Sequence, residues 1–561
     1  MRKPLLLVLV ALLLSTTAHA GNNTSDLPAV PTIAALRLNS FPTPTLYVQG
    51  FRSLNDGGQG PVNYDASDST TADNSCTVYV DAAGHRYKRD TQGQGVNFFW
   101  CGAYGDNSHD DTTALQAALT VASAATNPGV YGVNSPAAGS SSAFCGTGYF
   151  KVSGTLTLTG FISLVGQGNT TDGAGCRIKQ VTAGIPLLQV AAGSDGNSAS
   201  IYLHGIDLIA GASSETPGTA LFYVPATVAS VNSIYIDHVW FQTPEDLAVR
   251  IDGGDDIQIT DNTFDVSAFH AISLGSAGKQ VSNVRIVGND FFDIRAGVVE
   301  LNNAIDWTFA HNTVFGAVGG TQIPFVIDAL TTNPVNAKNG TITGNVVSRA
   351  NSLIQANSAA QNLAITGNAA VLATAPLILV GGGSAALASL TVTGNALDGA
   401  AGTGVGIIDI PATFGIVNST ISGNAITCND GGSSDFGIHS PATAADHNHI
   451  WANAYGGCTT NLSVHSQPMN GVDDGTASGT LAPGTISAGA QFTSSLTVPG
   501  ALPNQECQTV LPQTGLPAGI VTFCFVSNTN TITLVEQNVT AGGIAVSSHQ
   551  LIARVRSASS Y

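Results

Sequence analysis

The sequence Ile286-Val287-Gly288-Asn289 is one copy of a pattern that recurs between Asp237 and Tyr455. In each copy an apolar residue is followed two positions later by a residue that is usually Gly or polar, and then by Asn. The eight copies are ITDN (259–262), IVGN (286–289), FAHN (309–312), ITGN (342–345), ITGN (365–368), VTGN (392–395), ISGN (421–424) and IWAN (450–453).

The spacing of these copies predicts a solenoid of β-strands. Successive Asn residues lie 27, 23, 33, 23, 27, 29 and 29 positions apart, and a period in this range is typical of repeat architectures. Short β-branched runs such as 249–251 and 299–301 indicate strands. We therefore predict a right-handed parallel β-helix, with Asn at a left-handed turn and its amide bonded to the next coil. An Asn-Gly-rich set of β-hairpins in a sandwich is the alternative.

The first twenty residues predict export. Met1–Ala20 combines Arg2 and Lys3 with an apolar run and a small-residue cleavage site, as secretory signals do. Its removal would change the net charge from −18 to −20, because both lost charges are positive. So acidic a chain disfavours nucleic acid and anionic membranes as partners, and we expect a secreted protein, extracellular or periplasmic.

Eight cysteines in an exported chain predict disulfides. No Cys-x-x-Cys pair is present, which argues against a cysteine metal site. Although eight cysteines allow 105 connectivities, we predict bonds between the sequence-close pairs Cys76/Cys101, Cys145/Cys176, Cys428/Cys458 and Cys507/Cys524.

A single amphipathic helix is predicted just before the first strands. Asp110 or Asp111 is expected to cap it, and Leu115, Ala118 and Leu119 share one face. A helix in this place would cover the open apolar end of the solenoid.

The sequence around this helix resembles a known superfamily. The motif Gly102-Ala103-Tyr104-Gly105-Asp106, followed by DDTTALQAAL (110–119), is similar to the entry segment of pectate-lyase-like proteins. That superfamily comprises β-helical polysaccharide lyases, polygalacturonase-type hydrolases and phage tailspike depolymerases. The Gly57–Gly60 stretch, the 84–89 stretch and Phe99-Trp100 resemble the module that precedes the motif in tailspike-like members. The resemblance implies the fold but not the reaction, because the motif lies in the cap.

Changes in composition and in the pattern of strand and turn residues along the chain predict its domains. We expect a signal peptide at 1–20, an N-terminal module at 21–100, the cap helix and first coils at 101–195, the β-helix at 196–470 and an antiparallel β-domain at 471–561. The terminal modules resemble those of tailspikes, which implies a homotrimer as one oligomeric state.

Charge is concentrated in the first half of the solenoid. Residues 237–328 contain thirteen acidic and four basic residues, whereas 329–429 contain four charged residues in all. Alternation of side chains predicts two outward columns on neighbouring coils. They are Arg250, Ser273, Glu300 and Val326, and beside them Asp252, Gly275, Asn302 and Asp328.

This polar face is the predicted active site. The predicted catalytic residues are Glu300, Asp252, His270 and Asp246, and the predicted substrate-binding residues are Arg250, Arg295 and Asp328. Glu300 is the strongest candidate because it lies in mid-strand, where turn chemistry does not explain a carboxylate. With Asp252 two coils away, the expected carboxylate spacing favours an inverting glycosidase.

Each of these residues also has a purely structural interpretation. Aspartates such as Asp252 follow Gly-rich turns and often bond the local backbone. His270 fits a structural histidine equally well, and Glu300 fits an ion pair with Arg250. Asp237, His238 and Asp306 are interpreted as turn residues.

Three functions remain open from the sequence. An acid-rich, base-poor face favours a hydrolase that acts on polysaccharide. A polysaccharide lyase is the alternative, and calcium held by the acidic cluster is the cofactor that would support it. A secreted glycan-binding protein without catalysis is the third.

Overall fold

The computed structural model describes residues 27–91, 95–124, 142–167, 175–191, 199–211, 220–228, 231–242, 247–265, 270–294, 297–316, 323–329, 336–356, 361–373, 376, 378–380, 387–399, 405–410, 416–428, 436–440, 448–464, 471–473, 475–498, 501, 503, 505–510 and 516–556. The predicted signal peptide, 1–20, lies outside these residues. The chain forms two compact units, one of residues 1–92 with 99–102 and one of residues 93–98 with 103–561.

The first unit is a small β-module. Its five-stranded sheet has the order β1-β2-β3-β5-β4 and is accompanied by the short helix α1 (Ile33–Arg37). Its strands are β1 (Ala29–Val30), β2 (Thr45–Val48), β3 (Gly60–Tyr64), β4 (Val78–Val80) and β5 (Arg86–Arg89). Tyr79 and Tyr87 are fully buried in its core with Ile33 and Leu36. The buried Arg89 guanidinium donates to the Tyr79 hydroxyl and to the Gly58 carbonyl, so its hydrogen-bonding groups are satisfied.

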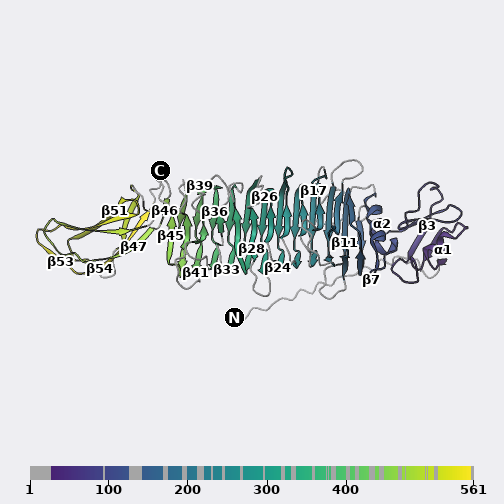
Figure 1. The fold of residues 1–561 in the computed structure, drawn as a ribbon, viewed down its shortest axis with the longest axis horizontal. Coiled ribbons are helices and arrows are strands. Elements are labelled where there is room, and N and C mark those ends of the chain that lie inside the picture. Colours follow the sequence, from purple (N-terminus) through teal and green to yellow (C-terminus); the bar gives the residue numbers. More distant parts are fainter. Residues whose placement is uncertain are drawn as a thin grey trace, which may run out of the picture. The chain divides into compact units, whose positions relative to one another are not determined.

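The second unit is a right-handed parallel β-helix, as predicted. Three long parallel sheets of 12, 14 and 13 strands run along it among the described residues (Figure 1). The 14-stranded sheet extends from β6 (Val96–Asn97) to β46 (Gly471–Asp473), and the 13-stranded sheet from β7 (Asp106–Asp110) to β44 (Ala454–Gly456).

The 12-stranded sheet carries the predicted site and contains one strand from each successive coil. Its strands are β10 (Leu156–Thr159), β13 (Leu188–Ala191), β16 (Ala220–Val224), β19 (Leu247–Ile251), β22 (His270–Leu274), β25 (Gly297–Leu301), β28 (Ile323–Ala329), β31 (Ala350–Ala356), β34 (Ile378–Val380), β38 (Gly406–Asp409), β42 (Phe436–Ser440) and β45 (Thr460–Val464).

The eight repeated asparagines form one continuous ladder, buried in all copies but the last, Asn453, which is partly exposed; this confirms the predicted stacking. Each amide nitrogen donates to the next amide oxygen at 2.8–3.1 Å. That oxygen also accepts the preceding asparagine's backbone N–H, as Asn345 does from Asn312 at 2.9 Å. Since unpaired buried polar groups are costly, the ladder strongly specifies the coil register.

The predicted conformation of the asparagines is wrong in one respect. The left-handed residue is the one before each Asn, with φ from 50° to 71°. Five of these eight residues are glycines, and Asp261, His311 and Ala452 are the others. Glycine adopts this conformation without steric cost, which explains the Gly-Asn pairs of the repeat.

Beside the ladder, the solenoid core contains stacked aromatic rings. The Phe241, Phe264 and Phe291 rings are parallel, with centroids 4.8 and 4.7 Å apart. These distances match the spacing of neighbouring strands, so one buried phenylalanine from each coil continues the stack.

The predicted helix is present as α2 (Thr112–Ser123), at the N-terminal end of the solenoid (Figure 1). It buries Leu115, Ala118, Leu119 and Ala122, as the sequence pattern predicts. Asp111 occupies the N-cap position, but its carboxylate accepts from the backbone N–H groups of Tyr104 and Gly105. The Asp110 carboxylate accepts the N–H of Thr112, at 3.0 Å.

After β46, antiparallel sheets replace the parallel ones. Two three-stranded sheets have the orders β47-β54-β50 and β49-β52-β51, and β48 pairs with β53. Their strands are β47 (Gly475–Leu481), β48 (Gly484–Ile486), β49 (Gln491–Thr497), β50 (Glu506–Val510), β51 (Ile520–Asn528), β52 (Thr531–Asn538), β53 (Ile544–Val546) and β54 (His549–Arg556). The predicted C-terminal antiparallel architecture is therefore present.

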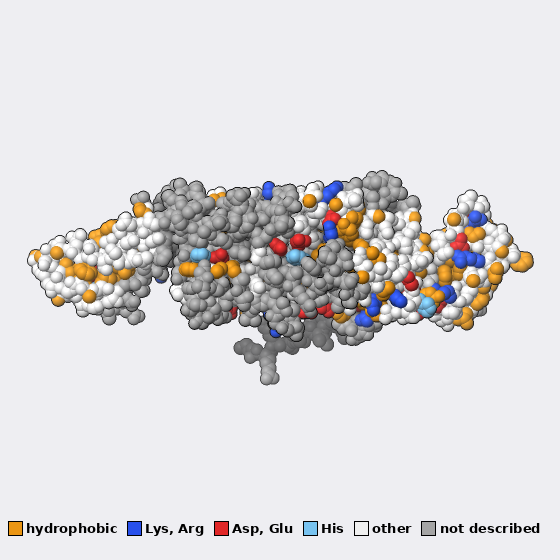
Figure 2. All heavy atoms as spheres, in the orientation of Figure 1, with side chains coloured by type: hydrophobic (Ala, Val, Ile, Leu, Met, Phe, Trp, Pro, Cys, Tyr) orange, Lys and Arg blue, Asp and Glu red, His pale blue; other side chains and the backbone are white. Residues whose placement is uncertain are grey.

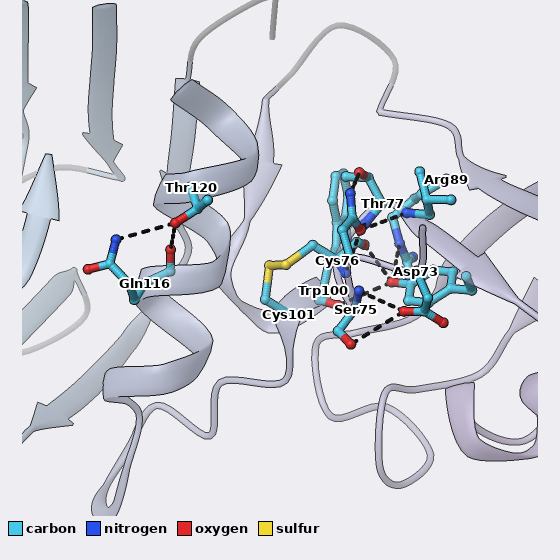
Figure 3. Close-up of a disulfide and its surroundings, with 12 residues drawn as sticks. Asp73, Ser75, Cys76, Thr77, Arg89, Trp100, Cys101, Gln116 and Thr120 are labelled. Atoms are coloured by element: carbon cyan, nitrogen blue, oxygen red, sulfur yellow. Dashed lines mark hydrogen bonds between the residues drawn. A yellow bond between two sulfur atoms is a disulfide. The ribbon is translucent and has the colours of Figure 1, made fainter. Parts of the chain in front are cut away.

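All four predicted disulfides are present. They join Cys76 to Cys101, Cys145 to Cys176, Cys428 to Cys458 and Cys507 to Cys524. Figure 3 shows the first of them, with Asp73 and Ser75 hydrogen-bonded nearby in the first unit. The described residues contain no helix that is long and apolar enough to cross a membrane.

A buried ion pair on the 13-stranded sheet predicts a pH-dependent stability. Arg177 of β12 (Cys176–Gln180) lies 3.2 Å from Asp207 of β15 (Ile206–Ala210), whose side chain is 1% exposed. Burial raises the pKa of Asp207 to about 6, despite the lowering effect of Arg177. Because the pKa is higher in the folded state than in the unfolded one, the fold favours the protonated form of Asp207. The stability contributed by this preference is complete below about pH 4 and is lost as the pH rises through about 6.

We therefore expect the Asp207→Asn variant to lack this fall in the free energy of unfolding with rising pH. Between pH 4 and 7 the wild type should lose about 2–3 kcal/mol of unfolding free energy relative to the variant. Urea unfolding of both proteins across this pH range measures the difference. Parallel pH profiles would contradict the assignment.

Candidate active site

One column of outward side chains crosses the 12-stranded sheet in register. Strand pairing places Arg250 beside Ser273, Ser273 beside Glu300, Glu300 beside Asp328, and Asp328 beside Gln355. Neighbouring strands are about 4.8 Å apart, so the Glu300 and Asp328 side chains leave adjacent coils side by side. Figure 2 shows acidic side chains next to a histidine near mid-length of the solenoid.

The predicted position of Asp328 is therefore wrong by two residues. The sequence alignment placed Val326 beside Glu300 and Asp328 in the Asp252 column. In the structure Val299 pairs with Ile327, Glu300 pairs with Asp328, and Val326 is fully buried. This register puts a second carboxylate directly next to Glu300.

Glu300 is half-buried in the middle of β25 and is held by a short polar network. Its Oε2 accepts a hydrogen bond from the Ser273 hydroxyl at 2.7 Å. Asn302 in turn donates to that hydroxyl at 3.2 Å. The network orients one carboxylate oxygen toward β22.

His270, at the start of β22, approaches the Asp328 carboxylate. It pairs with Gly297, which has no side chain, on the intervening coil. Across that coil its Nε2 lies 3.9 Å from Asp328 Oδ2, and both side chains are 16% exposed. Among the described residues His270 Nε2, which is buried, has no hydrogen-bond partner, so this nitrogen is an unused donor or acceptor beside Asp328.

Arg250 and Asp252 are engaged with each other. Arg250 Nε donates to Asp252 Oδ1 at 2.8 Å, and its guanidinium lies over the Tyr223 ring. The buried Asp252 also accepts from the Tyr223 hydroxyl at 3.0 Å and from the Ala226 N–H. Arg250 is thus paired with Asp252, and Asp252 has a local structural role. Its predicted catalytic role remains untested.

The other two predicted site residues, Asp246 and Arg295, lie outside the described residues. Many acids that made the region charge-rich lie at bends, where Asp256, Asp261, Asp293 and Asp306 have positive φ. Turn geometry, more than a shared function, explains much of that charge concentration.

Several aromatic residues of this region belong to the core and are not available to stack on a sugar. Phe241 and Phe291 are fully buried, and Trp307 is 3% exposed. The Phe292 and Phe315 rings instead stack on the outer surface of the 13-stranded sheet at 37% and 40% exposure.

The same column contains a second carboxylate–histidine pair that the sequence analysis missed. Asp409 pairs in register with His439, whose Nδ1 lies 2.7 Å from Asp409 Oδ1. Phe436 stacks on the His439 ring at 4.6 Å. Extending the strand alignment beyond Asp328 would have found this pair.

The calcium expected for a lyase has no identified ligand set at Glu300. Within the described part of the chain, a group of His, Cys, Asp or Glu residues with metal-ligand spacing occurs elsewhere, at His204, Asp237 and His238.

The N-terminal module matches a family model. Residues 29–92 match the phage tail protein small four-stranded beta-sheet domain. No curated protein is detectably similar to the chain in sequence.

Several solved tailspike structures are similar to the chain. The tailspike of Acinetobacter phage vB_ApiP_P1 is 13% identical, with 94% of this chain and 98% of that chain covered and a TM-score of 0.48. The tailspike of Acinetobacter baumannii bacteriophage Fri1, a capsular polysaccharide depolymerase, is 14% identical, with 95% and 98% covered and a TM-score of 0.42. A mutant tailspike of E. coli bacteriophage HK620 in complex with a pentasaccharide is 13% identical, with 86% and 97% covered and a TM-score of 0.44.

At these TM-scores the similarity to the tailspike structures supports no conclusion about the activity of this chain. The predicted parallel β-helix fold is confirmed by the strand pairing of the chain itself, and the phage tail match concerns residues 29–92 alone.

Proposed function

We propose that the protein is a secreted polysaccharide-degrading enzyme that hydrolyses glycosidic bonds on the outer face of the 12-stranded sheet. The observation that carries this proposal is the register that places Glu300 beside Asp328, with His270 at 3.9 Å from Asp328. Glycosidases use two carboxyl groups, one as an acid and one as a base or nucleophile.

Hydrolysis fits these residues better than elimination does. A uronate lyase needs a base together with cationic charge that neutralises the substrate carboxylate. Arg250, the basic residue in this column, already pairs with Asp252. The lyase would therefore depend on Arg295, on His270 as base, or on added calcium.

The spacing of the pair favours retention of the anomeric configuration. Adjacent coils are about 4.8 Å apart, close to the roughly 5–5.5 Å between the carboxyl groups of retaining enzymes. The inverting geometry predicted from the sequence assumed Asp252, two coils away, as the partner of Glu300.

A glycan panel tests this function. The tag-free mature protein is incubated with capsular and plant polysaccharides, with and without a chelator. We expect new reducing ends, no absorbance from unsaturated uronates, no effect of the chelator, and a first product of unchanged anomeric configuration by proton NMR.

The other outcomes separate the alternatives. Calcium-dependent unsaturated product would replace the hydrolase with a lyase. Glycan-array binding without any released product would identify a non-catalytic binding protein. The predicted homotrimer is a separate proposal, and a monomeric mass in solution scattering would exclude it.

A further inference from the structure

Two histidines and an aspartate meet at a bend of the solenoid, away from the 12-stranded sheet. His204 ends β14 (Ala199–His204), Asp237 ends β17 (Val231–Asp237), and His238 follows at the left-handed position with φ 52°. His204 pairs in register with Asp237 on the next coil. One ligand atom from each of the three residues lies within 4.8 Å of the others.

Both imidazole rings direct the same nitrogen at one carboxylate oxygen. His204 Nδ1 lies 2.9 Å and His238 Nδ1 lies 3.1 Å from Asp237 Oδ2. The other oxygen, Asp237 Oδ1, is buried and accepts no hydrogen bond from the part of the chain that the structure describes, although the nearby Tyr202 hydroxyl interacts electrostatically with the carboxylate. Two imidazole nitrogens therefore share one oxygen while the second oxygen accepts no hydrogen bond, which is an inefficient arrangement for hydrogen bonding alone.

Other histidine–carboxylate contacts in the described part of the chain are simple pairs. His85 with Asp81, His109 with Asp106, and His439 with Asp409 each bring one ring to one carboxylate at 2.7–2.8 Å. The same holds for His549 with Glu536 at 2.5 Å and for His270 with Asp328 at 3.9 Å. The arrangement at Asp237 differs because a second ring shares the oxygen.

We propose that His204, Asp237 and His238 bind a divalent transition-metal cation such as Zn²⁺. Atoms bound to a tetrahedral Zn²⁺ at about 2.0–2.2 Å lie roughly 3.3–3.6 Å from one another. The two N–O distances here, 2.9 and 3.1 Å, would need to lengthen by only a few tenths of an ångström to hold the ion. Imidazole and carboxylate ligands suit Zn²⁺, Ni²⁺, Cu²⁺ and Fe²⁺, whereas Ca²⁺ prefers oxygen ligands alone. Asp237 Oδ1, which accepts no hydrogen bond from the described residues, would then be able to coordinate the ion.

The ion would link two successive coils. His204 belongs to one coil and Asp237 and His238 to the next, so a bound ion adds a cross-link between them. The His238 side chain is 59% exposed, which leaves coordination positions open to water. His204 lies three coils before β25 and Asp237 lies two coils before it, and both end strands of the 14-stranded sheet, so the site is distinct from the proposed hydrolytic pair.

The test uses the tag-free mature protein, stripped with a chelator and titrated with ZnCl₂ or with CaCl₂ by calorimetry. Co²⁺ absorption in the visible region reports imidazole and carboxylate ligation independently. We expect one Zn²⁺ per chain, a higher melting temperature with Zn²⁺, and little response to Ca²⁺.

A matched pair of variants assigns the site. His238→Gly removes a ligand, and glycine suits its left-handed backbone. His311→Gly is the control, because His311 occupies the corresponding bend position with φ 53°. We expect Zn²⁺ affinity to fall at least about tenfold in His238→Gly and to be unchanged in His311→Gly. Absence of Zn²⁺ binding, equal binding by His238→Gly and the wild type, or preference for Ca²⁺ would each overturn the proposal.

Discussion

Replacing Glu300 with glutamine is expected to lower the rate of polysaccharide cleavage by about two to four orders of magnitude, as loss of a general acid or base does. Glutamine is nearly isosteric, and its amide oxygen can still accept the Ser273 hydrogen bond of 2.7 Å. Folding should therefore be unaffected. Reducing-end release and the melting temperature are measured on the same preparation.

Two further variants make this result specific. Asp328→Asn should cause a loss of similar size, because Asp328 is the register partner of Glu300. Asp306→Asn is the matched control, since it makes the same change at a solvent-exposed bend, where asparagine accepts the positive φ of 54°. Full activity in Glu300→Gln with an unchanged melting temperature would show that the reaction takes place elsewhere.

Replacing Asn312 with alanine is expected to destabilise the solenoid by about 3–5 kcal/mol. The Asn312 side chain donates to Asn345 Oδ1 at 3.1 Å and to the Ile286 carbonyl at 3.0 Å. Its oxygen accepts from the backbone and side-chain N–H groups of Asn289. Alanine leaves all of these buried groups without their partner.

An exposed ladder supplies the control for this variant. Asn362 donates to Asn339 Oδ1 at 2.8 Å in a solvent-exposed bond, and its φ is 54°. Asn362→Gly removes an amide-to-amide bond while suiting that backbone, so its effect should stay within about 1 kcal/mol. Thermal unfolding and native-state hydrogen exchange of the central coils compare the two. Equal stability of Asn312→Ala and Asn362→Gly would contradict the role assigned to the buried ladder.

The sequence was sufficient to predict the fold because the asparagine repeat reports a physical requirement. The side-chain amide of a buried asparagine must form hydrogen bonds on both of its sides. Only stacked coils supply these partners at every copy of the asparagine repeat. The repeat did not reveal which of its residues has the left-handed backbone conformation, because Gly and Asn both adopt that conformation.

The active-site register was harder to predict, for a specific reason. A shift of one residue would move Asp328 to the buried face, but a shift of two preserves the alternation of inward and outward side chains. Hydrophobic patterning of β28 therefore allowed Asp328 to pair with either Asn302 or Glu300. Only the backbone pairing distinguishes these registers.

The histidine cluster was missed for a related reason. His204 is 33 residues before Asp237, and no asparagine repeat marks its coil. Without a register for the coils that precede Asn262, the sequence did not show that His204 and Asp237 are neighbours.

The most direct test of the proposed active site is a crystal structure of the Glu300→Gln variant with an oligosaccharide of its substrate. We predict a glycosidic oxygen bound between residues 300 and 328 on the outer face of the 12-stranded sheet, with His270 in contact with the sugar. An oligosaccharide bound instead on the Phe292–Phe315 surface of the 13-stranded sheet, with the residue 300 and 328 side chains untouched, would contradict it.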